Sequence, residues 1–304
     1  MGIKDFFNIK VGDETFMNSC NSVELSDLSG KTIAIDGNLI LWKSMAAIKN
    51  PLKDNEGNIT THINVALSKI LLMAKHNINQ IWVFDNPAIS ERKKATVQKR
   101  NESRKKYNSI EMKSQYFHDI MTVLRYLGIV YIIVPRDVEA EQFAAWMTRG
   151  HHEYLCDYVL TTDPDTILFK GNMLRQYTTG RGRSKKDHLC TIDYEDFMEH
   201  NDLSHEELEK IAAILGHDFH DGIRGIGKLT VYQKVKYGYD LPDECINALE
   251  QFRMEPDNYI GLEETHKYEI NIEELKKYLY NRAFNVDRLE ERLNNYEKNY
   301  TTFL

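Results

Sequence analysis

Aspartates follow three short apolar segments of the chain, at the point where each segment ends. The segments are Ile33-Ala-Ile-Asp36, Trp82-Val-Phe-Asp85 and Val159-Leu-Thr-Thr-Asp163-Pro-Asp165. A single aspartate in such a position usually forms a turn or caps a helix. Several in succession indicate a shared site, because the carboxyl ends of the strands in an open α/β sheet border one crevice, where ligands bind.

Further carboxylates extend this pattern. Glu139 and Glu141 stand at a predicted helix start after a fourth apolar segment, and Asp218 follows Leu215-Gly-His. So many carboxylates in one crevice repel one another unless a cation neutralises them. Oxygen ligands without histidine or cysteine at ligand spacing favour Mg²⁺ or Mn²⁺ over zinc. Two such ions can activate a water and stabilise a leaving oxygen, so these residues indicate phosphodiester hydrolysis.

The elements that must position these acids are short β-branched runs alternating with longer amphipathic ones, which is typical of strands joined by crossover helices. We expect strands over 32–35, 81–84, 130–134 and 158–160, and helices near 64–76, 114–127 and 139–149. From His205 onward the pattern changes to helix, Gly-rich turn and helix, and then to a helical tail over 272–280 and 286–294. The sequence therefore predicts an α/β fold with a mostly parallel central sheet flanked by helices.

Charge is distributed unevenly along the 304 residues, although the formal net charge is only −7. Residues 90–113 contain nine basic and three acidic side chains, whereas residues 243–298 contain fourteen acidic and eight basic ones. A basic segment beside an acidic crevice can offset the repulsion between the acids and the phosphates of a nucleic acid. The charge distribution therefore favours a nucleic-acid partner that the net charge would argue against.

Several other classes are not indicated. No apolar run approaches the roughly 18 residues of a membrane span, so no membrane partner is expected. The four cysteines lie far apart, and the motifs that bind nucleotide phosphates are missing. The N-terminus lacks a basic region followed by an apolar stretch, which predicts an intracellular protein. Both the nucleus and a viral replication compartment remain open.

With these motifs in this order, the chain resembles the flap endonucleases, the structure-specific 5′ nucleases of DNA replication and repair. Met1-Gly2-Ile3 resembles the N-terminus of the family, and the segments ending at Asp36 and Asp85 resemble its first two metal motifs. The remaining matches are Val138-Glu139-Ala-Glu141-Gln-Phe-Ala-Ala, Thr162-Asp163-Pro-Asp165, Leu215-Gly-His-Asp218 and Gly222-Ile-Arg-Gly225-Ile-Gly227-Lys228. The last two resemble the helix-two-turn-helix of the family.

The resemblance implies a PIN-like 5′ nuclease core with a helical arch and a helix-two-turn-helix element. It assigns residues 1–200 to the nuclease core, with a helical gateway and arch over 86–118. It assigns 201–240 to the DNA-binding helix-two-turn-helix, and 241–304 to a helical C-terminal segment that packs on the core.

Site residues also follow from the resemblance. It implies two Mg²⁺ (or Mn²⁺) ions bound by Asp36, Asp85, Glu139, Glu141, Asp163, Asp165, Asp218 and Asp221. It places three basic residues of the arch at the scissile phosphate, namely Lys93, Lys94 and Arg100. It assigns DNA contacts to Gly2, Trp42, Lys99, Arg104, Gly225, Gly227 and Lys228, and a K⁺ ion to the helix-two-turn-helix.

Two of these assignments have a physical basis of their own. An exposed Trp42 could stack on a base, which stabilises binding by about 1–3 kcal/mol per base. Gly225 and Gly227 lack side chains, so their backbone amides could approach a phosphate at the start of the next helix.

The function implied is that of a metal-dependent nuclease that hydrolyses DNA where a 5′ flap meets a duplex, with or without 5′ to 3′ exonuclease activity. Its partner would be branched or flapped double-stranded DNA. Glu297, Tyr300, Phe303 and Leu304 resemble a sliding-clamp peptide. A junction resolvase or exonuclease of the same superfamily, an RNA-directed nuclease and a catalytically inactive nucleic-acid-binding scaffold remain alternatives. None of the expected carboxylates is missing, which favours an active enzyme.

Overall fold

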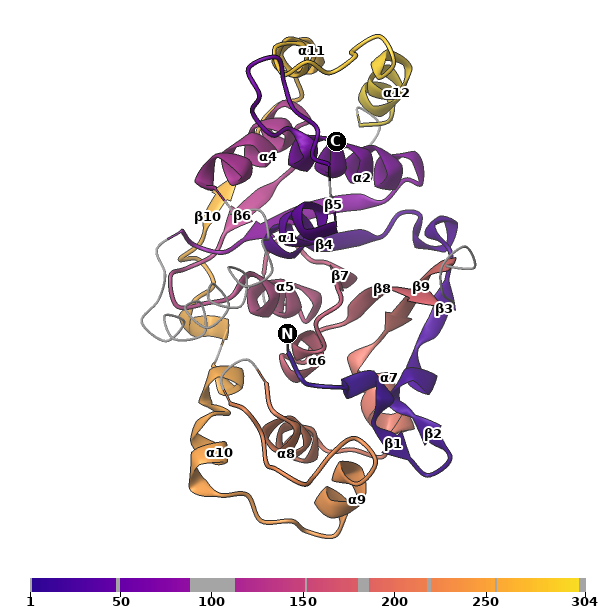
Figure 1. Cartoon of the computed structure of the whole chain (residues 1–304), viewed down its shortest axis with the longest axis vertical. Helices are drawn as coiled ribbons and strands as arrows, with labels where there is room; N and C mark the ends of the chain where they lie inside the picture. The colour runs from indigo at the N-terminus through magenta and orange to yellow at the C-terminus, as the bar shows by residue number, and fades with distance from the viewer. Residues whose placement is uncertain are drawn as a thin grey trace. The chain divides into compact units, whose positions relative to one another are not determined.

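The computed structural model describes residues 2–47, 50–87, 113–150, 152–179, 186–217, 220–254 and 256–300. The chain forms two compact units. Figure 1 labels the helices and strands of both. The first unit combines residues 1–24 with 141–261, and the second combines residues 25–140 with 262–304. The domain ranges expected from the sequence follow motifs rather than contacts, and they stay a prediction.

The second unit contains three parallel strands: β4 (Thr32–Asp36), β5 (Asn79–Phe84) and β6 (Tyr131–Ile133). A short antiparallel strand, β10 (Glu264–His266), pairs with β6. The central strands are almost wholly apolar and buried, as expected for parallel strands covered on both faces. The four strands predicted from apolar runs are confirmed within a few residues, counting β7 of the first unit.

In the part of this unit that the structure describes, five α-helices accompany the sheet: α1 (Gly37–Ala47), α2 (Thr61–Lys75), α4 (Ser114–Tyr126), α11 (Ile272–Tyr280) and α12 (Glu290–Tyr300). In α4, Tyr116, Ile120, Val123 and Leu124 are buried, which is the one-sided spacing of a helix that packs on a core. The last helix begins four residues later than predicted, because residues 286–289 form a turn.

The first unit contains the strands β7 (Tyr158–Thr161), β8 (Met173–Thr179), β9 (Lys186–Ile192) and β3 (Asn21–Val23). Strand β7 pairs in parallel with β8, and the other two pairings are antiparallel. A small hairpin joins β1 (Lys10–Val11) to β2 (Glu14–Thr15). The prediction of a mostly parallel sheet flanked by helices is thus confirmed, with antiparallel additions.

Its α-helices in the described ranges are α5 (Ala140–Thr148, whose first residue belongs to the second unit), α6 (Asp165–Leu168), α7 (Tyr194–His200), α8 (His205–Leu215), α9 (Val231–Lys236) and α10 (Asp243–Asn247). The core includes Phe6, Phe16 and Phe197, whose ring centroids lie 5.1–5.7 Å apart. These rings attach the N-terminal segment to α7. None of the helices in the described ranges is both long and apolar enough to cross a membrane.

A buried ionic cluster ties three helices of the second unit together. Asp119 of α4 accepts hydrogen bonds from the Tyr278 hydroxyl at 2.7 Å, from Gln115 at 3.0 Å and from the Arg282 guanidinium at 3.1 Å. Its other oxygen lies 2.8 Å from Nε2 of His62, in α2. Burial opposes ionisation of Asp119, but these hydrogen bonds outweigh it and lower the carboxyl pKa from 3.8 to about 2.

We expect the Asp119→Ala variant to be less stable than the wild type by about 3 kcal/mol at pH 7, since it leaves buried partners without an acceptor. A lowered folded-state pKa means that the carboxylate stabilises the fold above pH 4 and that this contribution is lost as pH falls towards 2. In urea unfolding between pH 2 and pH 7, the free energy of unfolding should therefore fall less steeply at low pH in the variant than in the wild type. The control is His118→Ala, which changes an exposed residue of the same helix. If the free energy of unfolding falls equally steeply at low pH in Asp119→Ala and in the wild type, the assignment is contradicted.

Candidate functional site

Asp36 and Asp85 stand at the carboxyl ends of two neighbouring parallel strands, as predicted. Asp36 ends β4 opposite Val83, and its Oδ1 accepts the Leu39 amide at 2.9 Å, which caps α1. Asp85 follows β5 directly. Both side chains therefore lie at the same edge of the sheet in the second unit.

Asp85 is held from two sides. Its Oδ2 accepts a hydrogen bond from Nδ2 of Asn38 at 2.9 Å, and its backbone amide donates a hydrogen bond to Oδ1 of Asn38 at 3.1 Å. Its Oδ1 accepts the amide of Ala140, the first residue of α5, at 2.9 Å. Asn38 was not predicted as a site residue, although it lies two residues after Asp36 in the same motif.

The two glutamates at the start of α5 differ in their backbone setting. Glu139 precedes the helix, whereas Glu141 lies in its first turn. Residues two apart on a helix do not share a face. With Glu139 outside the helix this restriction does not apply to the pair. The boundary between the two units falls between Ala140 and Glu141, so each glutamate belongs with a different set of acids.

In the first unit, Glu141, Asp163 and Asp165 form a second set. The Thr161 hydroxyl donates to Oε1 of Glu141 at 3.4 Å, and the Thr166 hydroxyl donates to the same oxygen. The Asp163 amide donates to the Thr161 hydroxyl at 3.0 Å, and Asp165 begins α6. Glu141 and Asp165 are both buried. Thr161 and Thr166 were not predicted, because only the tertiary fold brings them to Glu141.

The N-terminal segment packs directly against these acids. The Ile3 amide donates to Oδ1 of Asp165 at 3.1 Å. Gly2 has a φ of 69°, and a Cβ at this position would overlap the carboxylate of Asp163. Glycine is therefore required here both by its backbone conformation and by the close approach. The predicted DNA contact of Gly2 stays a prediction.

Both sets offer the hard oxygen donors that Mg²⁺ and Mn²⁺ prefer. We refer to Asp36, Asp85 and Glu139 as the second-unit acids and to Glu141, Asp163 and Asp165 as the first-unit acids. Within the described ranges, no group of three or more His, Cys, Asp or Glu side chains already has the geometry of a metal site. Another predicted ligand, Asp218, lies outside the described residues.

The Gly-rich turn lies between α8 and α9, which contact each other. Gly225 has a φ of 86°, and no atom lies within 4 Å of a Cβ placed on Gly225 or Gly227, so the backbone of this turn is open. Lys228 forms an exposed ion pair with Asp5 at 3.3 Å. Two helices and an open turn are thus observed, while the helix-two-turn-helix assignment, its K⁺ ion and its DNA contacts stay predictions.

The other predicted site residues are Asp221, Trp42, the basic residues of the arch and the C-terminal tail. Asp221 is exposed, and its carbonyl oxygen accepts the Lys4 ammonium at 3.1 Å. Trp42 lies in α1 and is half-buried. The arch residues Lys93, Lys94, Lys99, Arg100 and Arg104 lie outside the described residues, as do residues 301–304 of the C-terminal tail.

Profiles of known families match two stretches of the chain. The XPG N-terminal domain matches residues 1–107, and the XPG I-region matches residues 128–218. Among curated relatives, the flap endonuclease 1 of Methanocella arvoryzae is 25% identical over 312 residues, which span 89% of this chain and 90% of the relative. The matched stretches contain both sets of acids and Asp218.

Solved structures share the fold. Flap endonuclease-1 from Methanococcus jannaschii matches with a TM-score of 0.74 at 22% identity, over 100% of both chains. The catalytic core of Rad2 in complex with DNA substrate matches with a TM-score of 0.69 at 18% identity, over 97% of this chain and 100% of that one. The Holliday junction-resolving enzyme GEN1, solved with product DNA and a Mg²⁺ ion, gives 0.50 at 19% identity, over 91% and 66%.

Proposed function

This chain belongs to the flap endonuclease family, whose XPG profiles cover more than half of it, and we propose that it is a metal-dependent, structure-specific 5′ nuclease. Its substrate is DNA in which a 5′ flap or a junction interrupts a duplex. The observation that supports this most directly is the placement of the acids, at the carboxyl ends of β4 and β5 and at the starts of α5 and α6.

In this proposal the acids of each unit bind divalent ions for phosphodiester hydrolysis. Bound ions would activate the attacking water and neutralise charge on the phosphate. The residues of the chain orient the ligands. Asn38 and the start of α5 hold Asp85, two threonine hydroxyls hold Glu141, and the Ile3 amide holds Asp165. Such fixed hydrogen bonds keep carboxylates in position before the substrate arrives, which is the basis of electrostatic preorganisation.

Substrate binding is assigned to other elements. The open turn at Gly225 and Gly227 would bind duplex backbone through its amides, with a K⁺ ion as an added contact. The basic arch, including Arg100, would face the scissile phosphate, and Trp42 would stack on a base near the cut. The tail over 300–304 would bind a sliding clamp.

A panel of labelled substrates tests the proposal. With Mg²⁺, we expect cleavage near the junction of a 5′-flap duplex, weaker cleavage of a nicked duplex, and none of any substrate after chelation with EDTA. A four-way junction and an RNA hairpin complete the panel, since they separate a resolvase and an RNA-directed nuclease from a flap nuclease. The Asp163→Ala variant controls for contaminating nucleases.

The outcomes distinguish the alternatives. Preferential cleavage of the four-way junction would favour the resolvase. Tight binding of the flap duplex without cleavage under any divalent metal would favour the inactive scaffold. Cleavage that persists in EDTA would contradict the metal-dependent mechanism.

A further inference from the structure

A groove in the first unit lies at the C-terminal ends of α5 and α6, the two helices whose starts hold the first-unit acids. Two cavities meet there, and both are lined by Arg149 and Lys170. The larger has a volume of about 520 Å³. Its other described lining residues are Thr148, Asn172, Tyr194 and Glu195. The polar lining residues of the smaller one include His205, Glu209 and Arg253.

The groove has three cations, Arg149, Lys170 and Arg253, which differ in whether an acid pairs with them. Arg253 is fixed by the buried carboxylate of Glu209, which accepts hydrogen bonds from its Nε at 3.1 Å and from a terminal nitrogen of its guanidinium at 2.7 Å. Arg149 and Lys170 form no ion pair with any residue in the described ranges. Arg253 is therefore pre-oriented and largely compensated, whereas the charges of Arg149 and Lys170 are not.

The pKa of the His205 imidazole is sensitive to the electrostatic potential in this groove. His205 is the first residue of α8, and its Nδ1 lies 3.0 Å from the Tyr194 hydroxyl. Burial, together with the charges of Lys170, Arg149 and Arg253, lowers the pKa of its imidazole to about 4, against the opposing charge of Glu209. All three cations thus act on the same point, and the ring is neutral at pH 7.

The backbone at Lys170 is also unusual. Lys170 has a φ of 60°, in the left-handed region that favours glycine or asparagine, and its amide closes the end of α6 by donating to the Ile167 carbonyl at 3.0 Å. A cation just after a helix is favoured by the helix dipole, which would explain a positive charge here in purely structural terms. However, α6 has only four residues, and asparagine or glycine would close it with less strain. A strained residue of this kind is more readily explained by a function of its side chain.

We propose that Arg149, Lys170 and Arg253 form a binding site for a phosphate group. Two uncompensated cations and a pre-oriented guanidinium around a polar groove suit a tetrahedral dianion, since arginine and lysine form short charge-assisted hydrogen bonds with phosphate oxygens. Tyr194 and Asn172 also line the larger cavity and add to its polar character. The phosphate can be free or can belong to a nucleic-acid backbone, and the site does not depend on the nuclease function.

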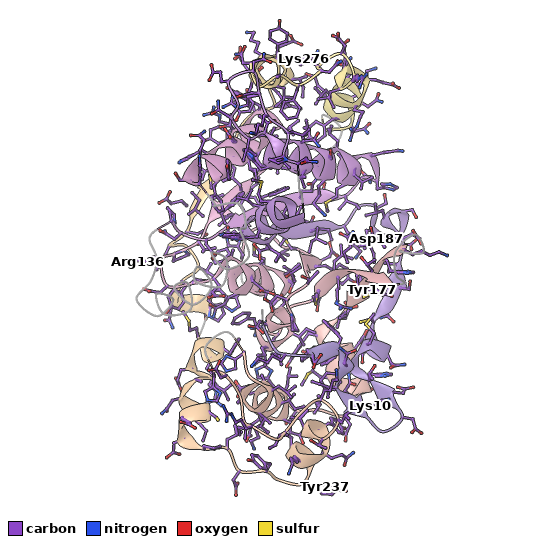
Figure 2. All side chains as sticks on the ribbon, in the orientation of Figure 1. Lys10, Arg136, Tyr177, Asp187, Tyr237 and Lys276 are labelled. Carbon is purple, nitrogen blue, oxygen red and sulfur yellow. The ribbon has the colours of Figure 1, made fainter. Side chains whose placement is uncertain are left out.

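Inorganic phosphate is the first probe, titrated calorimetrically into the full chain against chloride at matched ionic strength. We expect saturable binding that is weakened roughly ten-fold or more in Arg149→Gln and in Lys170→Asn, since each loses a charged hydrogen bond. Asparagine tolerates the left-handed backbone, so Lys170→Asn should fold like the wild type. Lys10→Gln, an exposed lysine of β1 labelled in Figure 2, makes the same change of charge elsewhere in this unit and should bind normally.

His205 locates the ligand. In an NMR titration, bound phosphate should raise the pKa of the His205 imidazole from about 4, because a dianion offsets the neighbouring cations. A blunt duplex is the second probe. If the phosphate comes from a nucleic acid, duplex binding should weaken in the same two variants and should be competed by phosphate. If it is a free group, only phosphate binding should change.

Either of two results would overturn the proposal. One is the absence of any saturable phosphate binding by the wild type together with duplex binding that the two variants do not alter. The other is phosphate binding that Arg149→Gln and Lys170→Asn retain at full strength, which would mean adventitious binding elsewhere.

Discussion

Replacement of Asp165 by alanine is expected to abolish cleavage of flapped DNA while junction binding stays within a few-fold of wild type. Metal ligands act mainly on the transition state, so their loss lowers the rate of the chemical step more than it lowers affinity. We expect the single-turnover rate at saturating enzyme to fall about 10³-fold or more, equivalent to about 4 kcal/mol. Rapid-quench kinetics with a labelled 5′ flap, together with a binding titration in Ca²⁺, measure both quantities.

Asp165 also accepts the Ile3 amide, so its loss could act through the N-terminal segment instead. Asp165→Asn separates these roles, because asparagine keeps the accepting oxygen but not the negative charge. It should be as inactive as Asp165→Ala and should melt like the wild type. Asp196→Ala, an exposed acid in the first turn of α7, serves as the control for removal of a carboxylate. An Asp165→Asn enzyme that cleaves at the wild-type rate would refute the assignment of Asp165 as a ligand.

The second large effect is expected for Arg100→Ala. If Arg100 faces the scissile phosphate, the single-turnover rate at saturation should fall about 10²- to 10³-fold, the range that follows removal of one preorganised donor. Gly225→Asp provides the contrast, because it adds a negative charge to the open turn and should raise the KM for flap substrates with little change in the saturated rate.

Single-turnover rates over a range of enzyme concentrations separate the two cases. Lys106→Ala removes a cation from the same basic segment and should leave the saturated rate near that of the wild type. If Arg100→Ala recovers the full rate at high enzyme concentration, the basic segment only attracts DNA electrostatically and does not act on the chemical step.

The parallel strands were predictable because each is a short, nearly continuous apolar run, as β4 and β5 illustrate. Strands β8 and β9 were not predicted. Their sequences, Met-Leu-Arg-Gln-Tyr-Thr-Thr and Lys-Asp-His-Leu-Cys-Thr-Ile, are partly polar and become strands through pairing with each other. Helix α1 was also missed, because its run Leu-Ile-Leu-Trp follows β4 without a turn and does not alternate between polar and apolar faces.

For the candidate site, too, only part of the arrangement was predictable from the sequence. The carboxylates are visible in the sequence, since each follows a strand or starts a helix. Their supporting partners are not. Thr166 reaches Glu141 across 25 residues, and the Ile3 amide reaches Asp165 across 162. Contacts at such separations depend on packing that no local pattern records. The groove at Arg149 was missed for the same reason, because its three cations come from distant parts of the chain.

The hydrogen bonds of Asp36 and Asp85 have a consequence for the thermodynamics of ion binding. A free aspartate loses rotamer freedom when it takes up a ligand, and that entropy loss weakens binding. Here backbone amides of α1 and α5 restrict both side chains. Their ordering cost is therefore met when the protein folds, and the binding entropy of a divalent ion should be set mainly by the water it releases. The two helices thus help to determine ion affinity without contributing a ligand of their own.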